Sequence, residues 1–161
     1  MTSKSTAALS VVRGQLVRMR TSDPWFSSAG VTVGVIDLPA RLVFTRGQCH
    51  ALALALNEAT DWPIVWVGRK TCIREPSCLR RPMVPCPCQV GHFAVRLPDG
   101  RILDIDGARH ETDVIGSVPL YEAIGTATPE LMTCITAGRR WPKPKMEVAR
   151  EFARTLLDEL A

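Results

Sequence analysis

The chain has 161 residues and a formal net charge of +4, from 20 Lys and Arg against 16 Asp and Glu. This length fits one domain with its own core. Hydrophobic and charged shares of 46% and 22% are ordinary for a globular protein. The longest apolar run, residues 51–56, is too short to cross a bilayer, so we expect no membrane association. The basic residues are spread along the chain with few aromatics, so no nucleic-acid partner is expected.

The first eight residues are small and polar and lack the apolar segment of a secretory signal. We expect residues 1–8 to be a disordered leader and residues 9–161 to form a single α+β domain. Six cysteines in such a chain favour a reducing, cytoplasmic compartment, with thiols or metal ligands before disulfides.

The first patterned elements are a strand and a helix. Residues 31–38 (VTVGVIDL) are rich in β-branched side chains and predict the strand. Residues 49–58 (CHALALALNE) predict the helix, because Ala and Leu are strong helix formers. Thr45 followed three residues later by Gln48 matches a capping box, which puts Thr45 at the N-cap, Gln48 at N3 and Cys49 in the first turn.

The middle of the chain predicts a buried strand, an insertion and a hairpin. Residues 64–67 (IVWV) are fully apolar and suit the buried strand. Residues 68–91 hold four cysteines and four prolines and are expected to form an insertion without regular structure. Residues 92–97 (HFAVRL) and 102–106 (ILDID) predict two strands, joined by a three-residue turn at residues 98–100 (PDG).

The last third of the chain is helical in character. Residues 119–124 and 129–137 suit two short helices. Residues 145–160 predict an amphipathic helix, whose apolar side chains recur every four residues and cover the body of the domain. These side chains are Val148, Phe152, Leu156 and Leu160.

Cys49 is the candidate nucleophile. A thiol is a good nucleophile only as a thiolate, and a helix N-terminus lowers its pKa through unpaired N–H groups and the helix dipole. Gly47 allows a substrate to approach the backbone closely. The Cys49 N–H, helped by the Gln48 side chain, is then expected to stabilise an oxyanion. Trp66 and Gly91 are further candidates for substrate contact.

The predicted hairpin supplies a base and an acid. A turn at residues 98–100 pairs Ala94 with Asp104 and puts His92 opposite Asp106. All four side chains then share one face, and the apolar residues of the hairpin take the other face, toward the core. Either aspartate is a candidate to orient the His92 imidazole, and His92 is the candidate base for Cys49.

The segments GQCHALALAL and GHFAVRLPDGRILDIDG resemble the papain-like and transglutaminase-like superfamily, and more narrowly its small bacterial and phage members. The resemblance covers residues 44–107. It implies a papain-like fold in which the cysteine helix packs on an antiparallel sheet, with C-terminal helices as cover, and a Cys–His–Asp triad. Cys49 and His92 match the nucleophile and the base. The LDIDG segment puts the family aspartate at Asp104, with Asp106 as its rival. The cysteine-rich insertion departs from the family pattern.

Four cysteines fall within the insertion at a spacing of C-x5-C-x7-C-x-C, namely Cys72, Cys78, Cys86 and Cys88. Four thiolates suit a structural zinc ion, although neither pair has the usual C-x2-4-C knuckle spacing. Disulfides and free thiols are the alternatives. Zinc would order a segment that has few apolar residues of its own.

Two functions follow from these patterns. The first is a thiol hydrolase, a cysteine peptidase or protein deamidase, that cleaves an amide bond in a protein or peptide through a thioester on Cys49 and needs no cofactor for catalysis. A transglutaminase-like acyltransferase is a variant of it. The second is a non-enzymatic, zinc-ordered interaction module of phage or plasmid origin, with the insertion as its working surface. The substrate and oligomeric state stay open.

Overall fold

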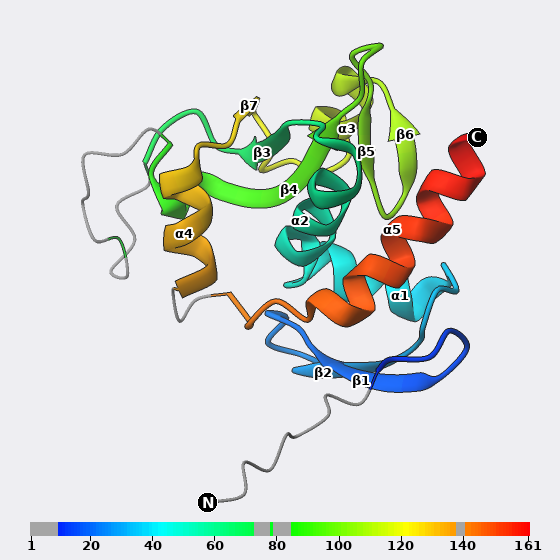
Figure 1. The fold of residues 1–161 in the computed structure, drawn as a ribbon. Coiled ribbons are helices and arrows are strands. Elements are labelled where there is room, and N and C mark those ends of the chain that lie inside the picture. The colour runs from blue at the N-terminus through cyan, green and yellow to red at the C-terminus, as the bar shows by residue number, and fades with distance from the viewer. Residues whose placement is uncertain (1–9, 73–77, 79–84, 138–140) are drawn as a thin grey trace, which may run out of the picture.

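The computed structural model describes residues 10–72, 78, 85–137 and 141–161. The predicted leader, residues 1–8, and most of the predicted insertion lie outside the described residues. The described chain is α+β, with helices packed on a five-stranded antiparallel sheet and a separate two-stranded sheet beside them (Figure 1). The predicted α+β class with an antiparallel sheet is therefore confirmed. No helix in these described ranges is long and apolar enough to cross a membrane.

The larger sheet has the strand order β6-β5-β4-β3-β7, and β1 pairs with β2 in the smaller one. The strands are β1 (Leu16–Arg20), β2 (Ser28–Thr32), β3 (Ile64–Gly68), β4 (Val90–Arg96), β5 (Ile102–Asp104), β6 (Gly107–Arg109) and β7 (Ala123–Thr126). The helices are α1 (Leu38–Thr45), α2 (Cys49–Thr60), α3 (Glu111–Gly116), α4 (Pro129–Ala137) and α5 (Met146–Leu160), with a 3-10 turn, η1, at Pro87–Gln89.

Helix α2 is the centre of the core, because it packs against β4 on one side and against α5 on another (Figure 1). Its Leu52 and Leu56 are buried, as are Phe93 on β4 and Phe152 on α5. Each such side chain stabilises the fold by about 1.5–3 kcal/mol through removal from water. The helix that carries Cys49 is thus fixed along its length.

The β4–β5 hairpin has the predicted register. Val95 lies opposite Leu103, and the Leu97 N–H donates to the Arg101 carbonyl at 2.8 Å. Gly100 takes a φ of 90°, the left-handed conformation that this turn needs. The register therefore brings Asp104 close to the start of β4, where His92 lies.

The second predicted strand of this hairpin is too long. Strand β5 ends at Asp104, and β6 turns back from Gly107, which pairs with Asp104 and has a φ of 93°. Asp-Gly is a strong signal for a tight turn, because glycine adopts positive φ without strain. Asp106 thus lies in a turn, and the predicted pairing of His92 with Asp106 is wrong.

The predicted capping box at the start of α2 is also wrong. Thr45 is the last residue of α1, where its hydroxyl donates to the Arg41 carbonyl at 2.6 Å. Gln48 occupies the N-cap of α2 but forms no side-chain cap bond. Cys49 nevertheless begins the helix, as predicted.

The strand predicted at residues 31–38 ends early, because the chain turns at Gly34, which has a φ of 81°. Helix α1 begins only at Leu38. Asp37 is its N-cap and accepts a hydrogen bond from the Ala40 N–H at 3.1 Å, and Pro39 opens the first turn. Proline suits this position because its missing N–H has no partner there in any case. Strand β2 ends at Thr32, and residues 33–37 connect it to α1.

Residues 119–124 do not form the predicted helix. Strand β7 takes residues 123–126 and pairs with β3, which gives the sheet its fifth strand. The helices predicted at residues 129–137 and 145–160 are present as α4 and α5.

Candidate active site

The base candidate and the acid candidate meet directly. His92 lies on β4 and Asp104 ends β5, and each is only 3% exposed. The His92 Nε2–H donates to the Asp104 carboxylate at 2.8 Å. The hairpin register is responsible, since it fixes both side chains on the same side of adjacent strands.

Asp104 has two further partners that hold it in the ionised state. The Arg109 guanidinium donates to the same carboxylate oxygen at 2.8 Å, and the Asp106 N–H donates to the other oxygen at 2.9 Å. Burial raises the pKa of Asp104, but the hydrogen bond and charge of His92 and the charge of Arg109 lower it overall. The buried carboxylate is therefore charged and fully bonded.

Asp106, the rival acid, has a different environment. Its side chain is 37% exposed and lies 3.6 Å from Arg41 and 3.8 Å from Arg109. Its contribution to His92 is indirect, through the backbone N–H that it gives to Asp104. The side chain that orients the imidazole is that of Asp104.

Cys49 is the buried thiol at the first residue of α2, with 1% of its surface exposed. Burial alone would raise its pKa, but the neighbouring imidazoles of His50 and His92 lower the pKa from 9.0 to about 6. A thiol with this pKa is mostly thiolate at neutral pH.

His92 has the complementary shift. Burial lowers the pKa of its imidazole, yet the hydrogen bond to Asp104 and the negative charges of Asp104 and Cys49 raise it from 6.5 to about 10. Its Nδ1 is buried and has no hydrogen-bond partner among the described residues. Between these two pKa values, the stable state of the pair is a Cys49 thiolate beside a His92 imidazolium held by Asp104.

A cleft of about 580 Å³ opens onto this arrangement. Its lining includes His92, Arg109, Gly91, Tyr121 and both aspartates, Asp104 and Asp106. Ser22, Thr45, Arg46, the end of β3, residues 88–90 and the segment after α3 complete it. Cys49 is not part of this lining, and only 1% of its surface is exposed.

The Tyr121 ring stacks on the His92 imidazole at the cleft. The two rings stack with centroids 6.2 Å apart and planes 19° apart. Burial and the negative charges of Cys49 and Asp104 raise the pKa of the Tyr121 hydroxyl, so it stays protonated. Gly91 makes room for the ring, since a Cβ there would lie 3.0 Å from it.

The residues on either side of Cys49 are held by the strap, residues 141–145, which leads into α5. The Gln48 side-chain amide donates to the Lys143 carbonyl at 3.1 Å and accepts from the Lys145 N–H at 3.2 Å. The His50 Nε2–H donates to the Pro142 carbonyl at 2.9 Å. The strap therefore fixes the start of α2.

The structure does not support the roles that were predicted for Gln48, Gly47 and Trp66. The Gln48 amide is engaged by the strap and does not line the His92 cleft, so the arrangement does not support its predicted oxyanion role. At Gly47, with a φ of 131°, a Cβ would lie 2.7 Å from the Ser22 backbone nitrogen, so the close approach is made by the chain itself. Trp66 packs over Gly125 on the neighbouring strand β7 and does not line the cleft, whereas Gly91 does.

The four cysteines of the insertion come together. Their sulfur atoms all lie within 4.8 Å of one another, with 3.2 Å between Cys72 and Cys88 and 3.3 Å between Cys78 and Cys86. Four thiolates bound to one zinc ion at about 2.3 Å would lie about 3.8 Å apart. The cluster therefore has the donor atoms and the size to hold a metal ion.

The cluster is tied to the candidate active site through the chain. Cys72 follows β3, and Cys86 and Cys88 precede β4, which carries His92. The two ends are joined where the Arg69 N–H donates to the Gln89 carbonyl at 2.9 Å. Cys88 also lines the cleft together with Gln89 and Val90, so the cysteine cluster lies at one of its walls.

Sequence reasoning missed three residues at this site. Arg109 follows the Asp106-Gly107 pair, which is itself a turn signal and could have put Arg109 beside Asp104 on a third strand. His50, the residue after Cys49, is 0% exposed, with its ring edge toward Trp141 at a centroid distance of 5.4 Å. Nothing in the local sequence of Tyr121 indicates its place over His92.

The arrangement as a whole is a buried thiol, an imidazole and a carboxylate with the charges that nucleophilic attack requires. Searches for similar proteins add nothing to this geometry, because no protein-family model, no curated protein and no solved structure matches the chain.

Proposed function

We propose that the protein is a cysteine-dependent amide hydrolase with a papain-like fold, in which Cys49 is the nucleophile, His92 the general base and acid, and Asp104 the orienting group. The observation that carries the proposal is the buried Asp104–His92 bond of 2.8 Å beside a cysteine whose pKa is lowered to about 6. Perturbed pKa values and matched hydrogen bonds are typical of catalytic groups.

The reaction follows from these charges. The Cys49 thiolate attacks the amide carbonyl carbon, and the N–H groups of the first turn of α2 are available to the oxyanion. His92 gives its proton to the leaving amine as the C–N bond breaks, which leaves a thioester on Cys49. His92 then takes a proton from water, the resulting hydroxide attacks the thioester, and the acid product leaves. Asp104 keeps the imidazole in position and stabilises its charge.

The leaving group and the group that resolves the thioester decide which member of this reaction class applies. A peptide nitrogen gives proteolysis, a glutamine side-chain nitrogen gives deamidation, and an amine in place of water gives acyl transfer. We favour hydrolysis of a protein or peptide amide.

The test is a covalent trap followed by turnover. A peptidyl vinyl sulfone should alkylate Cys49, and mixed peptide substrates analysed by mass spectrometry should show cleavage or the mass gain of deamidation. Cys49→Ala and His92→Ala should abolish both changes, while Cys134→Ala should retain them as the matched thiol control. Turnover that survives Cys49→Ala in a folded protein would exclude the mechanism.

We further propose that the four cysteines hold a structural zinc ion. All four donors are soft, their sulfur atoms are mutually close, and two of them are buried. Zinc there would fix the wall of the cleft and would take no part in bond breaking. The same cluster supports the rival function, a zinc-ordered interaction module. Stoichiometric zinc together with an unreactive Cys49 would favour that rival.

A further inference from the structure

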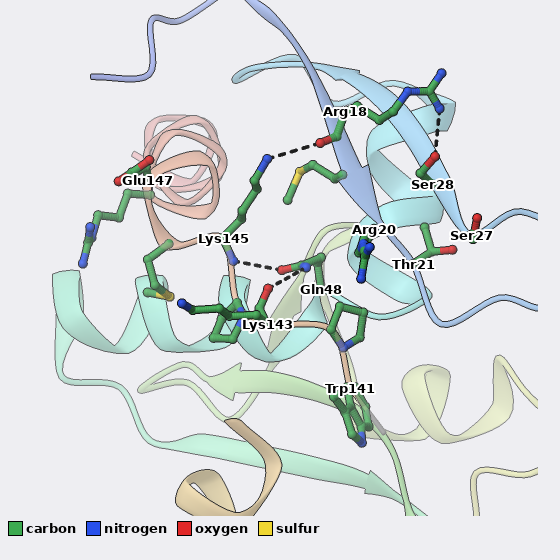
Figure 2. A pocket seen from close by; sticks show the side chains of 15 residues that line it. Arg18, Arg20, Thr21, Ser27, Ser28, Gln48, Trp141, Lys143, Lys145 and Glu147 are labelled. Atoms are coloured by element: carbon green, nitrogen blue, oxygen red, sulfur yellow. Dashed lines mark hydrogen bonds between the residues drawn. The ribbon is translucent and has the colours of Figure 1, made fainter. Parts of the chain in front are cut away.

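A second hollow in the surface, the basic groove, shares no lining residue with the His92 cleft. It measures about 1260 Å³ and lies between strand β1 and the strap (Figure 2). The lining residues with charged side chains are Arg18, Arg20, Lys143, Lys145, Glu147 and Arg150. The proposed hydrolase mechanism uses none of them.

One wall of the basic groove is an open strand edge. In the described chain, β1 pairs with β2 alone, and the Thr21 N–H donates to the Ser27 carbonyl at 2.9 Å. Backbone groups alternate in direction along an antiparallel ladder. The backbone N–H and C=O groups of every second residue, counted back from Thr21, therefore point toward β2. Those of the residues between them, Arg18 and Arg20, point away from β2.

A single side chain contact shows that this edge accepts hydrogen bonds. The Lys145 ammonium donates to the Arg18 carbonyl at 3.3 Å and so bridges the groove from the strap to β1 (Figure 2). Within the described residues, no backbone group bonds the Arg18 N–H, the Arg20 N–H or the Arg20 carbonyl. An exposed edge of this kind is a template for a further strand.

The charges at the groove are uncompensated. None of Arg18, Arg20, Lys143 and Lys145 forms an ion pair with any residue that the structure describes. Arg150 is paired with Glu58 at 3.0 Å, which leaves Glu147 as the acidic member of the lining. Four cations around an open strand edge attract an anionic strand.

We propose that the basic groove is a docking site for an extended acidic peptide segment of a partner protein, which adds as a third strand to the free edge of β1. Its backbone would bond Arg18 and Arg20, and Lys145 would leave the Arg18 carbonyl for a peptide carboxylate. This is the strand-addition mode, in which main-chain bonds give affinity and alternate side chains give specificity. The inference does not rest on the hydrolase mechanism.

A peptide fits these features better than a nucleic acid does. The unpaired N–H and C=O groups match a peptide backbone, which alternates the same groups, whereas a phosphate backbone only accepts. The aromatic side chain of the lining, Trp141, is packed against His50 and Phe93, at 5.4 and 5.5 Å between ring centroids. It is therefore not free to stack on a base.

The first experiment measures binding of a fluorescein-labelled peptide of alternating glutamate and threonine by fluorescence anisotropy. The wild-type chain should bind it, and added salt should weaken the complex because the cations are exposed. A peptide of alternating glutamine and threonine should bind at least about tenfold more weakly. The single variants Arg20→Glu and Lys143→Glu should each lose about fivefold or more in affinity. Arg101→Glu, in the β4–β5 turn, changes the net charge by the same amount as each of them and should bind as the wild type does.

The second experiment tests strand addition itself. Two versions of the acidic peptide carry N-methyl groups on alternate amides, one version on the odd and one on the even positions. One version should lose binding and the other should keep it, because only every second peptide N–H faces β1. Equal affinity of both versions, no binding by the wild type, or tighter binding of a single-stranded oligonucleotide than of the acidic peptide would overturn the proposal.

Discussion

Replacing His92 with alanine should move the pH at which Cys49 becomes reactive. In the wild type the pKa of Cys49 is about 6. Without His92, burial and His50 act in opposite directions on the thiol, so we take its ordinary value of 9.0 as the reference. At pH 6 about half of Cys49 is then thiolate in the wild type and about 0.1% in the variant. A thiolate whose thiol has a lower pKa is intrinsically less nucleophilic, by about 20-fold for a pKa difference of three.

These two effects give a crossing pair of pH profiles. His92→Ala should react about 20-fold more slowly than the wild type at pH 6 and about 20-fold faster at pH 10, with the crossing between about pH 7 and 8. The assay is alkylation by iodoacetamide with mass-spectrometric readout of the Cys49 peptide. His110→Ala, an exposed histidine at the N-cap of α3, is the control.

The midpoint of each profile does not depend on how accessible the sulfur is. A cavity opened by the substitution therefore changes the rate at every pH but leaves the midpoint in place. A midpoint near pH 6 in His92→Ala, or one near pH 9 in the wild type, would refute the electrostatic reasoning.

Three further outcomes are expected. Asp104→Ala should lower the free energy of unfolding in urea by about 3–5 kcal/mol, because it leaves His92 and Arg109 without their buried counter-charge. Asp106→Ala, the exposed control, should lower it by less than about 1 kcal/mol. Equal losses in the two variants would contradict the assignment of Asp104 as the acid that holds His92. The contribution of His92 to stability is complete below its unfolded pKa of 6.5 and is lost as the pH rises through about 10. The contribution of Asp104 is complete above its unfolded pKa of 3.8 and is lost as the pH falls through its lowered pKa in the folded protein. Urea titrations that show rising stability above pH 10 would contradict this pH dependence. The purified protein should hold one zinc per chain by elemental analysis, and Cys88→Ser should release it and lower the melting temperature; a metal content unchanged in Cys88→Ser would place the metal elsewhere.

Local patterns predicted the β4–β5 hairpin and α5 well. The PDG turn at residues 98–100 fixes its register without help from distant residues, so the approach of Asp104 to the histidine strand followed from the sequence. The four-residue spacing of Val148, Phe152 and Leu156 likewise fixed the buried face of α5.

The start of α2 could not be read in the same way. Thr45 and Gln48 match a capping box in sequence, but a separate helix, α1, ends at Thr45. The Gln48 side chain is instead hydrogen-bonded to the strap, which lies about a hundred residues further along the chain. The burial of His50 has the same long-range cause, because Pro142 and Trp141 cover it. Contacts of this kind leave no local signature.

The most direct measurement is the ¹⁵N NMR spectrum of the histidine side chains at pH 8, with His92 assigned by the spectrum of His92→Ala. The central claim is that Cys49 and His92 form a thiolate–imidazolium pair held by Asp104. Both ring nitrogens of His92 should therefore carry protons at this pH, and Cys49→Ala should lower the pKa of the imidazole. A neutral His92 with one protonated nitrogen at pH 8, unaffected by Cys49→Ala, would contradict the account.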